Sequence, residues 1–221
     1  MQLPRPTSTG WFGRYTLGAR AYDVLSCERP VYRVGRMDAI DRLGLRPGDR
    51  VLDLACGTGL NLPLLRERVG ETGQVTGLDA SASMLARAAA RVDAAGWRNV
   101  HLVRGDAADL TDLLDDGSAE ARDSAYDAVL ITYALSIIAP WREVWHQATD
   151  LLVPGGRAAV VDLSLPSGRG LLWWPLARFA CWTGGSDPHR EPWRLAEAEL
   201  TDVSTTVHRA GHVVVVVGSR P

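Results

Sequence analysis

Three aspartates, one within a short apolar run and two at the ends of such runs, are the residues of this sequence whose type and spacing point to chemistry. Asp53 lies within the first run, Asp79 ends the second, and Asp106 closes the third. In an open α/β sheet, ligands bind outside the carboxyl ends of the strands. We therefore expect the three carboxylates to line one site. Asp79 follows Gly59 by twenty residues, the spacing at which an acid accepts hydrogen bonds from ribose hydroxyls.

A glycine-rich turn follows the first apolar run. The stretch VLDLACGTGLNLPLL at 51–65 reads as a strand, a turn with Gly57 and Gly59, and a helix. Glycine has no β-carbon, so both positions can take unusual backbone angles and let a ligand approach the main chain. A dinucleotide fingerprint would need a third glycine where Leu62 stands, and Asp53 would be an odd charge under a pyrophosphate. The pattern favours a ligand without phosphate.

The elements that position these residues alternate along the chain. Strands are expected at 50–55, 75–78, 99–104, 126–133 and 157–163, and helices at 59–69, 82–95 and 141–152. Ser81 is the expected N-cap of the second of these helices, and VPGG at 153–156 is the expected stop of the third. Two β runs at 201–208 and 212–217 then predict a hairpin, with an antiparallel last strand.

Composition narrows the class of protein. The 221 residues have a net charge of -2, so there is no basic footprint for nucleic acid. The three cysteines, Cys27, Cys56 and Cys181, are too few for a disulfide framework and indicate a reducing compartment. No signal peptide or membrane-spanning run is visible, so a cytoplasmic protein is expected. No cluster has metal-ligand spacing, and no metal site is expected.

The order of elements resembles the class I S-adenosylmethionine-dependent methyltransferase fold over residues 50–218. The resemblance implies a Rossmann-like α/β fold with a mostly parallel seven-stranded sheet in the order 3-2-1-4-5-7-6, strand 7 antiparallel, and helices on both faces. Residues 44–221 would form this domain. Residues 1–43 would form a helical lid or arm, and residues 164–198 an insertion that binds the acceptor.

The resemblance also implies roles for individual residues. Asp53 would face the amino group of the cofactor's methionine part, Asp79 the ribose, and Asp106 the adenine amino group, with Met84 packed against the adenine ring. The full set of expected contacts with S-adenosylmethionine is Tyr22, Arg36, Asp53, Ala55, Gly57, Gly59, Asp79, Ala80, Met84, Asp106, Ala107 and Thr132.

Residues 126–166 narrow the resemblance to the ubiquinone and menaquinone methyltransferase superfamily. TYALSII at 132–138 looks closer still to bacterial N-methyltransferases of phospholipid and betaine-lipid head groups. AYDVLSCERPVYRVGR at 21–36 looks like their entry helix, in which Tyr22, Tyr32 and Arg36 would close over the cofactor. A buried side of this segment is expected from Tyr22, Leu25, Val31, Val34 and Met37.

Methyl transfer from a sulfonium is a direct displacement, in which the protein supplies alignment and a dry pocket. An amine acceptor must arrive unprotonated. Tyr133 could orient the acceptor or contact the cofactor, and it could equally be an ordinary aromatic residue at a strand end. His189 is a candidate base, although a loop histidine is more often solvated.

The expected function is methyl transfer to a small molecule or lipid head group, with an amine nitrogen favoured. A peripheral membrane contact through Arg169 and Arg178 is a further hypothesis. The alternatives are a quinone-type C-methyltransferase, a cofactor-binding protein that transfers nothing, and a cyclase or decarboxylase on the same fold.

Overall fold

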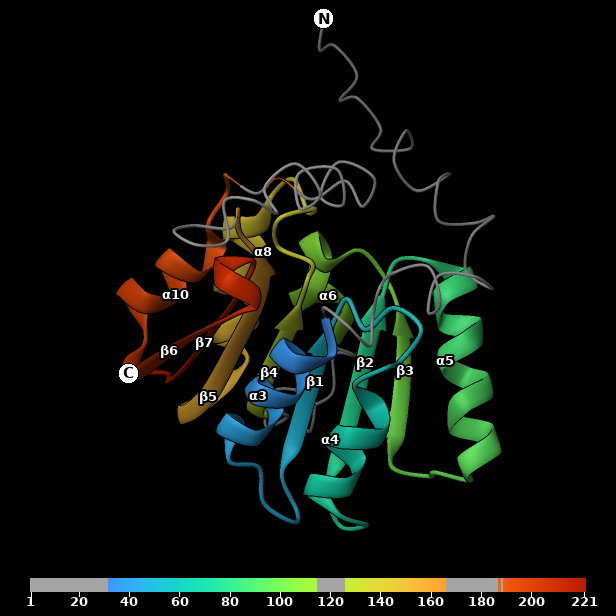
Figure 1. Ribbon diagram of the computed structural model, residues 1–221. Coiled ribbons are helices and arrows are strands. Elements are labelled where there is room, and N and C mark those ends of the chain that lie inside the picture. Colours follow the sequence, from blue (N-terminus) through green and yellow to red (C-terminus); the bar gives the residue numbers. More distant parts are fainter. Residues whose placement is uncertain (1–31, 115–125, 166–186, 188) are drawn as a thin grey trace, which may run out of the picture.

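The computed structural model describes residues 32–114, 126–165, 187 and 189–221. One seven-stranded sheet runs through them in the order β3-β2-β1-β4-β5-β7-β6 (Figure 1). Its strands are β1 (Arg50–Leu54), β2 (Gln74–Asp79), β3 (Val100–Arg104), β4 (Tyr126–Thr132), β5 (Leu152–Leu163), β6 (Thr201–His208) and β7 (Val213–Ser219). β7 pairs antiparallel with β5 and β6, and the other pairs are parallel. The predicted fold and strand order are confirmed.

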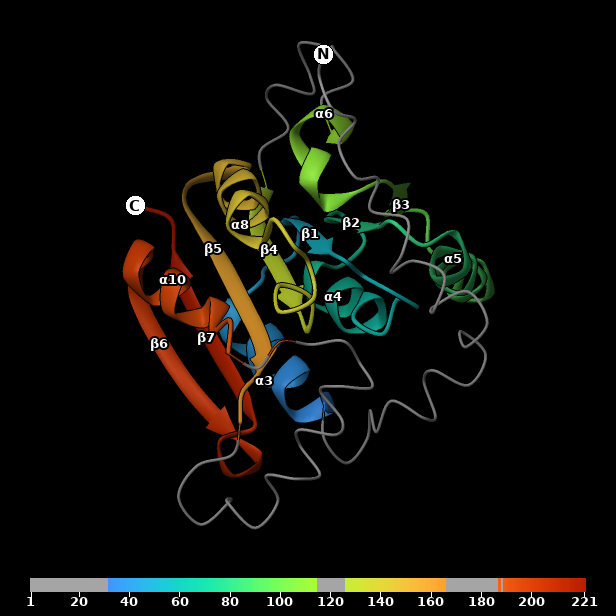
Figure 2. The same cartoon turned by 90° about the horizontal axis from the view of Figure 1, so that it is seen from above.

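Helices cover both faces of the sheet, as the view along its edge shows (Figure 2). One layer consists of α3 (Arg33–Leu43), α4 (Leu62–Val69) and α5 (Ala82–Ala95). The opposite layer consists of α6 (Leu110–Leu114), α8 (Trp141–Asp150) and α10 (Pro192–Glu199). Alternate residues of the central strands point into two hydrophobic cores, one under each layer. Both faces of β4 are therefore buried, as its nearly continuous apolar sequence predicts.

Helix α3 packs across β5 and β7 and belongs to the core of the sheet. Its buried residues include Ala39, Ile40 and Leu43. Met37, which was expected on the buried side, is 36% exposed, so this part of the prediction is wrong. The reason is Gly35: a β-carbon there would lie 2.6 Å from the Val213 side chain. The close approach at Gly35 turns its face of α3 toward the sheet, and Met37 toward solvent.

Capping residues, glycines and strand pairing set where the helices and strands begin. α5 has the predicted bounds, and the Ser81 hydroxyl accepts from the amide of Met84 at 3.4 Å. α4 begins at Leu62, three residues later than predicted, because Gly59 is left-handed with φ of 78°. β5 begins at Leu152 instead of residue 157. Its first residues are extended because Leu152 pairs with Tyr126 across a register shift.

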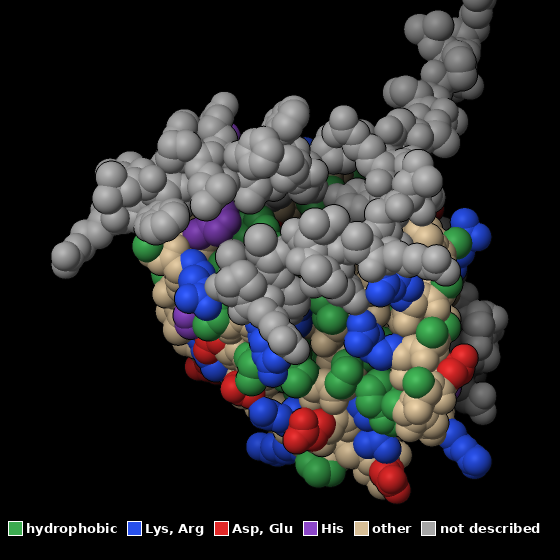
Figure 3. All heavy atoms as spheres, turned by 45° about the vertical axis from the view of Figure 1, so that its right-hand side comes forward, with side chains coloured by type: hydrophobic (Ala, Val, Ile, Leu, Met, Phe, Trp, Pro, Cys, Tyr) green, Lys and Arg blue, Asp and Glu red, His purple; other side chains and the backbone are tan. Residues whose placement is uncertain are grey.

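The parallel strands all end at one edge of the sheet, the upper edge in Figure 1. Among the described residues, no helix combines the length and apolar character needed to cross a bilayer. Arginine and acidic side chains are scattered over the face seen in Figure 3, with hydrophobic side chains between them.

Candidate functional site

The glycine turn after β1 connects the ends of β1 and β2, which are neighbours in the sheet. Ala55 is left-handed, with φ of 56°, and the amide of Cys56 donates to the Leu78 carbonyl at 2.9 Å. A β-carbon on Gly57 would meet nothing within 4 Å, whereas one on Gly59 would lie 2.7 Å from a Leu62 methyl. Gly57 thus borders open space, and Gly59 allows the turn to pack closely against its helix.

Asp79 holds this turn from the end of β2. One carboxylate oxygen accepts from the amide of Gly57 and the other from the amide of Ser81, both at 2.8 Å. Burial raises the pKa of Asp79, and the two backbone hydrogen bonds oppose that rise. Each carboxylate oxygen can accept more than one hydrogen bond, so hydroxyl groups of a ligand can still bind here. The structure therefore brings Gly57 and Asp79 together, as the sequence predicted.

Asp53 is completely buried on β1. Its Oδ1 accepts from the Asn61 side-chain amide at 2.7 Å, and its Oδ2 has no hydrogen-bond partner within the described part of the chain. Burial raises the pKa of Asp53 to about 7, while the Asn61 hydrogen bond and the charge of Arg36 oppose the rise. A buried carboxylate oxygen without a donor is costly. This oxygen is therefore suited to a cationic or hydrogen-bonding ligand.

A polar network from three elements surrounds Asp53. Arg36 of α3 donates from Nη1 to Asn61 Oδ1 at 3.0 Å and to Thr132 Oγ1 at 3.1 Å. Asn61 Nδ2 also lies 3.2 Å from Thr132 Oγ1. The structure thus gathers Arg36, Asp53 and Thr132, all of which were expected site residues. α3, the turn before α4 and the end of β4 meet at this carboxylate.

Sequence reasoning missed Asn61. The residue precedes a helix and reads as an N-cap, yet its side chain makes no capping bond. It is 1% exposed and points toward Asp53. The sequence did contain a signal, because Asn61 is a polar residue in the otherwise apolar stretch GLNLPLL. A buried side-chain amide needs polar partners, so such a residue indicates a polar site nearby.

Tyr133 follows β4 in a left-handed conformation, with φ of 58°. Its hydroxyl donates to the backbone carbonyl of Tyr32 at 2.6 Å, and the two rings lie 4.9 Å apart. The Arg36 guanidinium lies 5.5 Å from the centre of the Tyr133 ring. Such backbone strain is held only where the surroundings enforce it. Tyr133 links the β4 end to α3, and a direct role with the acceptor stays a prediction.

Further residues of the expected cofactor site lie at the end of β3 and at the start of α5. Asp106 accepts from the amide of Ala108 at 3.0 Å and so begins the short helix η2 (Ala107–Asp109). Met84 is 5% exposed, at the start of α5. The amide of Gly105 donates to the Asp79 carbonyl at 3.2 Å, which places the two strand ends side by side.

His189 is exposed, and its amide donates to the Asp187 carboxylate at 3.0 Å. No described contact joins it to the residues around Asp53. Its role as a base stays a prediction. Tyr22, Arg169, Arg178 and most of the predicted acceptor insertion at 164–198 lie outside the described residues.

His212, which the sequence did not single out, is 7% exposed beside the end of β5. Burial lowers its pKa, so the ring is neutral near pH 7. Nδ1 lies 2.7 Å from the Ser164 carbonyl. A carbonyl only accepts, so Nδ1 carries the proton.

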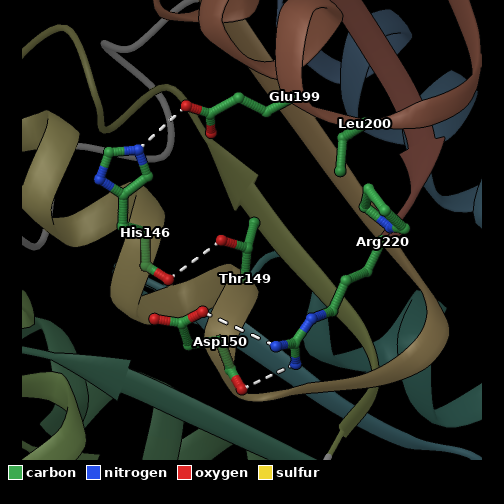
Figure 4. Close-up of a pocket in the computed structure, with 7 residues that line it drawn as sticks. His146, Thr149, Asp150, Glu199, Leu200 and Arg220 are labelled. Atoms are coloured by element: carbon green, nitrogen blue, oxygen red, sulfur yellow. Dashed lines mark hydrogen bonds and ion pairs between the residues drawn. The ribbon is translucent and has the colours of Figure 1, made fainter.

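A surface pocket lies at the opposite edge of the sheet (Figure 4). His146 and Glu199 pair there at 3.1 Å, and Arg220 binds the Asp150 carbonyl at 3.0 Å. These groups satisfy one another across α8, α10 and the end of β7. Such pairing is typical of surface contacts between neighbouring helices and strands. The pocket lies far from the glycine turn.

Comparisons with known proteins agree with this geometry. Residues 51–156 match the family described as a methyltransferase domain. The chain is 34% identical over 141 residues to the 2-phytyl-1,4-naphtoquinone methyltransferase of Thermosynechococcus vestitus, covering 64% of this chain and 58% of the relative. It is 30% identical over 144 residues to the demethylmenaquinone methyltransferase of Bacillus cereus, covering 65% and 56%. The chain thus spans less than two thirds of the length of these relatives.

The fold is similar to that of a solved structure of Haemonchus contortus phosphoethanolamine N-methyltransferase 2 in complex with S-adenosyl-L-methionine. The TM-score is 0.71 at 15% identity, with 100% of this chain and 62% of that chain covered. The domain match and the curated relatives support the expected class of enzyme, a methyltransferase. The narrower resemblance to lipid head-group N-methyltransferases stays a prediction.

Proposed function

We propose that this chain transfers the methyl group of S-adenosylmethionine to a small organic acceptor. The observation that carries the proposal is the buried Oδ2 of Asp53, which has no partner among the described residues and lies at the glycine turn. A ligand with an ammonium group would supply the missing donor and charge. The same ligand needs hydroxyls for Asp79 and no phosphate, and S-adenosylmethionine has this combination of groups.

The cofactor, when bound, supplies an electrophilic methyl group on its sulfonium. In the proposed site, Asp53 binds the ammonium, and the Arg36–Asn61–Thr132 network holds Asp53 in place. Asp79 binds the ribose hydroxyls while it keeps the turn closed through Gly57. The chain then contributes orientation and exclusion of water, which suffice for a direct displacement.

We place a quinol ring first among the acceptors. The curated relatives with 30–34% identity carry names that state methylation of a naphthoquinone or of demethylmenaquinone. An acceptor of this kind is methylated on ring carbon. Such prenylated quinones are lipids, so the proposal includes a peripheral membrane contact during acceptor binding.

An amine head group is the second candidate acceptor. It is favoured by the resemblance of TYALSII at 132–138 to lipid head-group N-methyltransferases. Both acceptors lose a proton during methyl transfer, and neutral His212, which directly precedes β7 and binds Ser164 beside the end of β5, is a candidate base for either.

Calorimetric titration with S-adenosylhomocysteine tests the cofactor site. Wild type should bind in the micromolar range, and Asp79→Ala should bind at least about 10-fold more weakly, because a hydrogen bond to a charged group contributes about 1.5–3 kcal/mol. Asp93→Ala on the exposed side of α5 is the matched control and should bind like wild type. No binding by folded wild type would overturn the proposal.

Turnover tests the acceptor. Wild type is incubated with S-adenosylmethionine and either reduced demethylmenaquinone or phosphatidylethanolamine vesicles, and release of S-adenosylhomocysteine is measured. Release with the quinol supports the first candidate, and release with the vesicles supports the second. Tight cofactor binding without release for either lipid would favour a binding protein or a cyclase.

A further inference from the structure

A second buried carboxylate lies at the same edge of the sheet and takes no part in the proposed cofactor site. Asp162 near the end of β5 is 0% exposed. Its Oδ1 accepts from the Ser136 hydroxyl at 2.6 Å and from the Leu163 amide at 2.8 Å. Its Oδ2 accepts from the Ser136 amide at 2.9 Å. Three donors thus partly compensate the burial of one charge, which would otherwise be more costly.

These hydrogen bonds join the end of β5 to the loop at 133–138. Ser136 lies in this loop, which begins with left-handed Tyr133 directly after Thr132 of the Asp53 network. The amides of Ile137 and Ile138 both donate to the Ala134 carbonyl, so the loop is a compact turn. Fixing Ser136 therefore fixes the turn that sets the direction of Tyr133.

A third segment is bound to the same turn. The Ser136 carbonyl accepts from the amide of Asp187 at 3.1 Å, and the Arg190 guanidinium donates to the Ile138 carbonyl at 2.5 Å. The charge of Arg190 also acts on Asp162, and Arg190 pairs with Asp187 at 3.4 Å. Asp162 thus lies at the centre of a joint between β5, the 133–138 turn and the segment before α10.

Only a carboxylate satisfies this arrangement. The backbone amides of Leu163 and Ser136, which can only donate, point at Asp162, one toward each oxygen. An asparagine at this position would place an NH2 group against one of these donors, although its volume is nearly the same. The joint therefore requires a charged acceptor in a fully buried place, a requirement that core packing alone does not impose.

We propose that Asp162 is a positioning residue for methyl transfer: by binding Ser136 it holds the 133–138 turn, and with it Tyr133, on the acceptor side of the cofactor site. This inference rests on the proposed function. Asp162 acts through Ser136 and does not itself contact the cofactor. In the proposed site the cofactor's ammonium and ribose are bound by Asp53 on β1 and Asp79 on β2, so loosening the turn should impair the acceptor step more than cofactor affinity.

The test compares Ser136→Ala and Asp162→Asn with Ser136→Thr, which keeps the hydroxyl. Ser136→Ala removes one bond to Asp162 and leaves the backbone bond, so it should fold even if Asp162→Asn does not. Val69→Ala is the control for lost stability, because Val69 is fully buried near the opposite edge of the sheet. All variants are studied as the full chain, well below their unfolding temperatures.

Two readouts need no acceptor. In Ser136→Ala, hydrogen exchange measured by mass spectrometry should become faster in peptides that cover 133–138 and 187–190, while the affinity for S-adenosylhomocysteine stays within about 2-fold of wild type. Val69→Ala should leave exchange in both peptides unchanged, and Ser136→Thr should restore it. Unchanged exchange in Ser136→Ala, or an equal loss of cofactor affinity, would overturn the inference.

The third readout is turnover with reduced demethylmenaquinone as the probe acceptor. Ser136→Ala should lower kcat/KM for the acceptor by about 10- to 100-fold, the loss expected when reacting groups are misplaced by about 1 Å. KM for the cofactor should hardly change. If wild type turns over and the variant matches it, Asp162 is only structural. If wild type binds cofactor but never turns over, the proposed function fails, while the exchange data still decide whether Asp162 holds the turn.

Discussion

Asp53 and Asp162 are both completely buried carboxylates, on the two strands that flank β4. They differ in how their oxygens are used. Asp162 accepts three hydrogen bonds, whereas Asp53 accepts one and has an oxygen with no partner in the described chain. The same residue type at the same edge therefore serves two purposes. The satisfied carboxylate joins parts of the chain, and in our proposal the unsatisfied one binds the ligand.

The pKa values of both carboxylates are raised, and different partners oppose the rise. Burial raises the pKa of Asp53 to about 7 and that of Asp162 to about 6. For Asp162 the rise is opposed by hydrogen bonds from Ser136 and Leu163, and for Asp53 by the single bond from Asn61. Desolvation is the largest cause of the raised pKa of both carboxylates.

The largest expected effect is on the pH dependence of stability. The pKa of Asp53 is higher in the folded chain than in the unfolded chain, so its contribution to stability is present below pH 3.8 and is lost as pH rises through about 7. The difference between these values corresponds to at most about 4 kcal/mol. Without ligand, Asp53→Asn should therefore flatten the fall in unfolding free energy between pH 5 and 8, measured by urea denaturation. An equal fall in both proteins would contradict the assignment.

Asp162→Asn should lower the free energy of unfolding at pH 8, in contrast to Asp53→Asn. It removes an acceptor from the Ser136 amide and buries an unsatisfied NH2 group, which should cost about 3 kcal/mol. Asp53→Asn removes an incompletely paired charge and should be neutral or stabilising under the same conditions. Chemical denaturation of the two variants side by side measures the contrast. A similar loss in both would show that the two carboxylates have the same structural role.

Cofactor affinity should depend on Asp53 more than on the Asp162 contacts, the reverse of the order expected for stability. Asp53→Asn removes the proposed partner of the cofactor's ammonium, and we expect about 100-fold weaker binding of S-adenosylhomocysteine, equivalent to about 2.7 kcal/mol. Ser136→Ala, which weakens the Asp162 joint, should stay near wild type. Calorimetry at pH 8 gives both affinities. Near wild-type binding by Asp53→Asn would place the amine elsewhere.

The smallest effect is expected for Asn61→Ala. This change removes the one donor to Asp53 found among the described residues and a partner of Arg36, and leaves the Arg36–Thr132 hydrogen bond in place. Cofactor affinity should fall by about 3- to 10-fold, consistent with about 1 kcal/mol for one hydrogen bond. Asn99 bonds backbone carbonyls at the opposite edge, so Asn99→Ala, compared at equal fraction folded, is the control. An Asn61→Ala affinity equal to wild type would remove Asn61 from the site.

The sequence by itself determined the fold, the glycine turn and the meeting of Asp53, Asp79 and Asp106 along one edge. These features depend on local periodicity and on a general rule, since parallel strands must all end on the same side of their sheet. The start of β5 was predicted less well, because residues 152–156 gain their extended form from partners on β4 and beyond β7.

Only the tertiary structure decided which polar groups meet. Asn61 joins Thr132 across 71 residues of sequence, and Asp162 joins Ser136 across 26. No local pattern encodes these pairs, because they arise when helices and loops from different parts of the chain pack against one strand end. For the same reason the sequence could place Asp53 and Asp162 at the ends of strands, but the difference in their roles depends on the donors that packing brings to each.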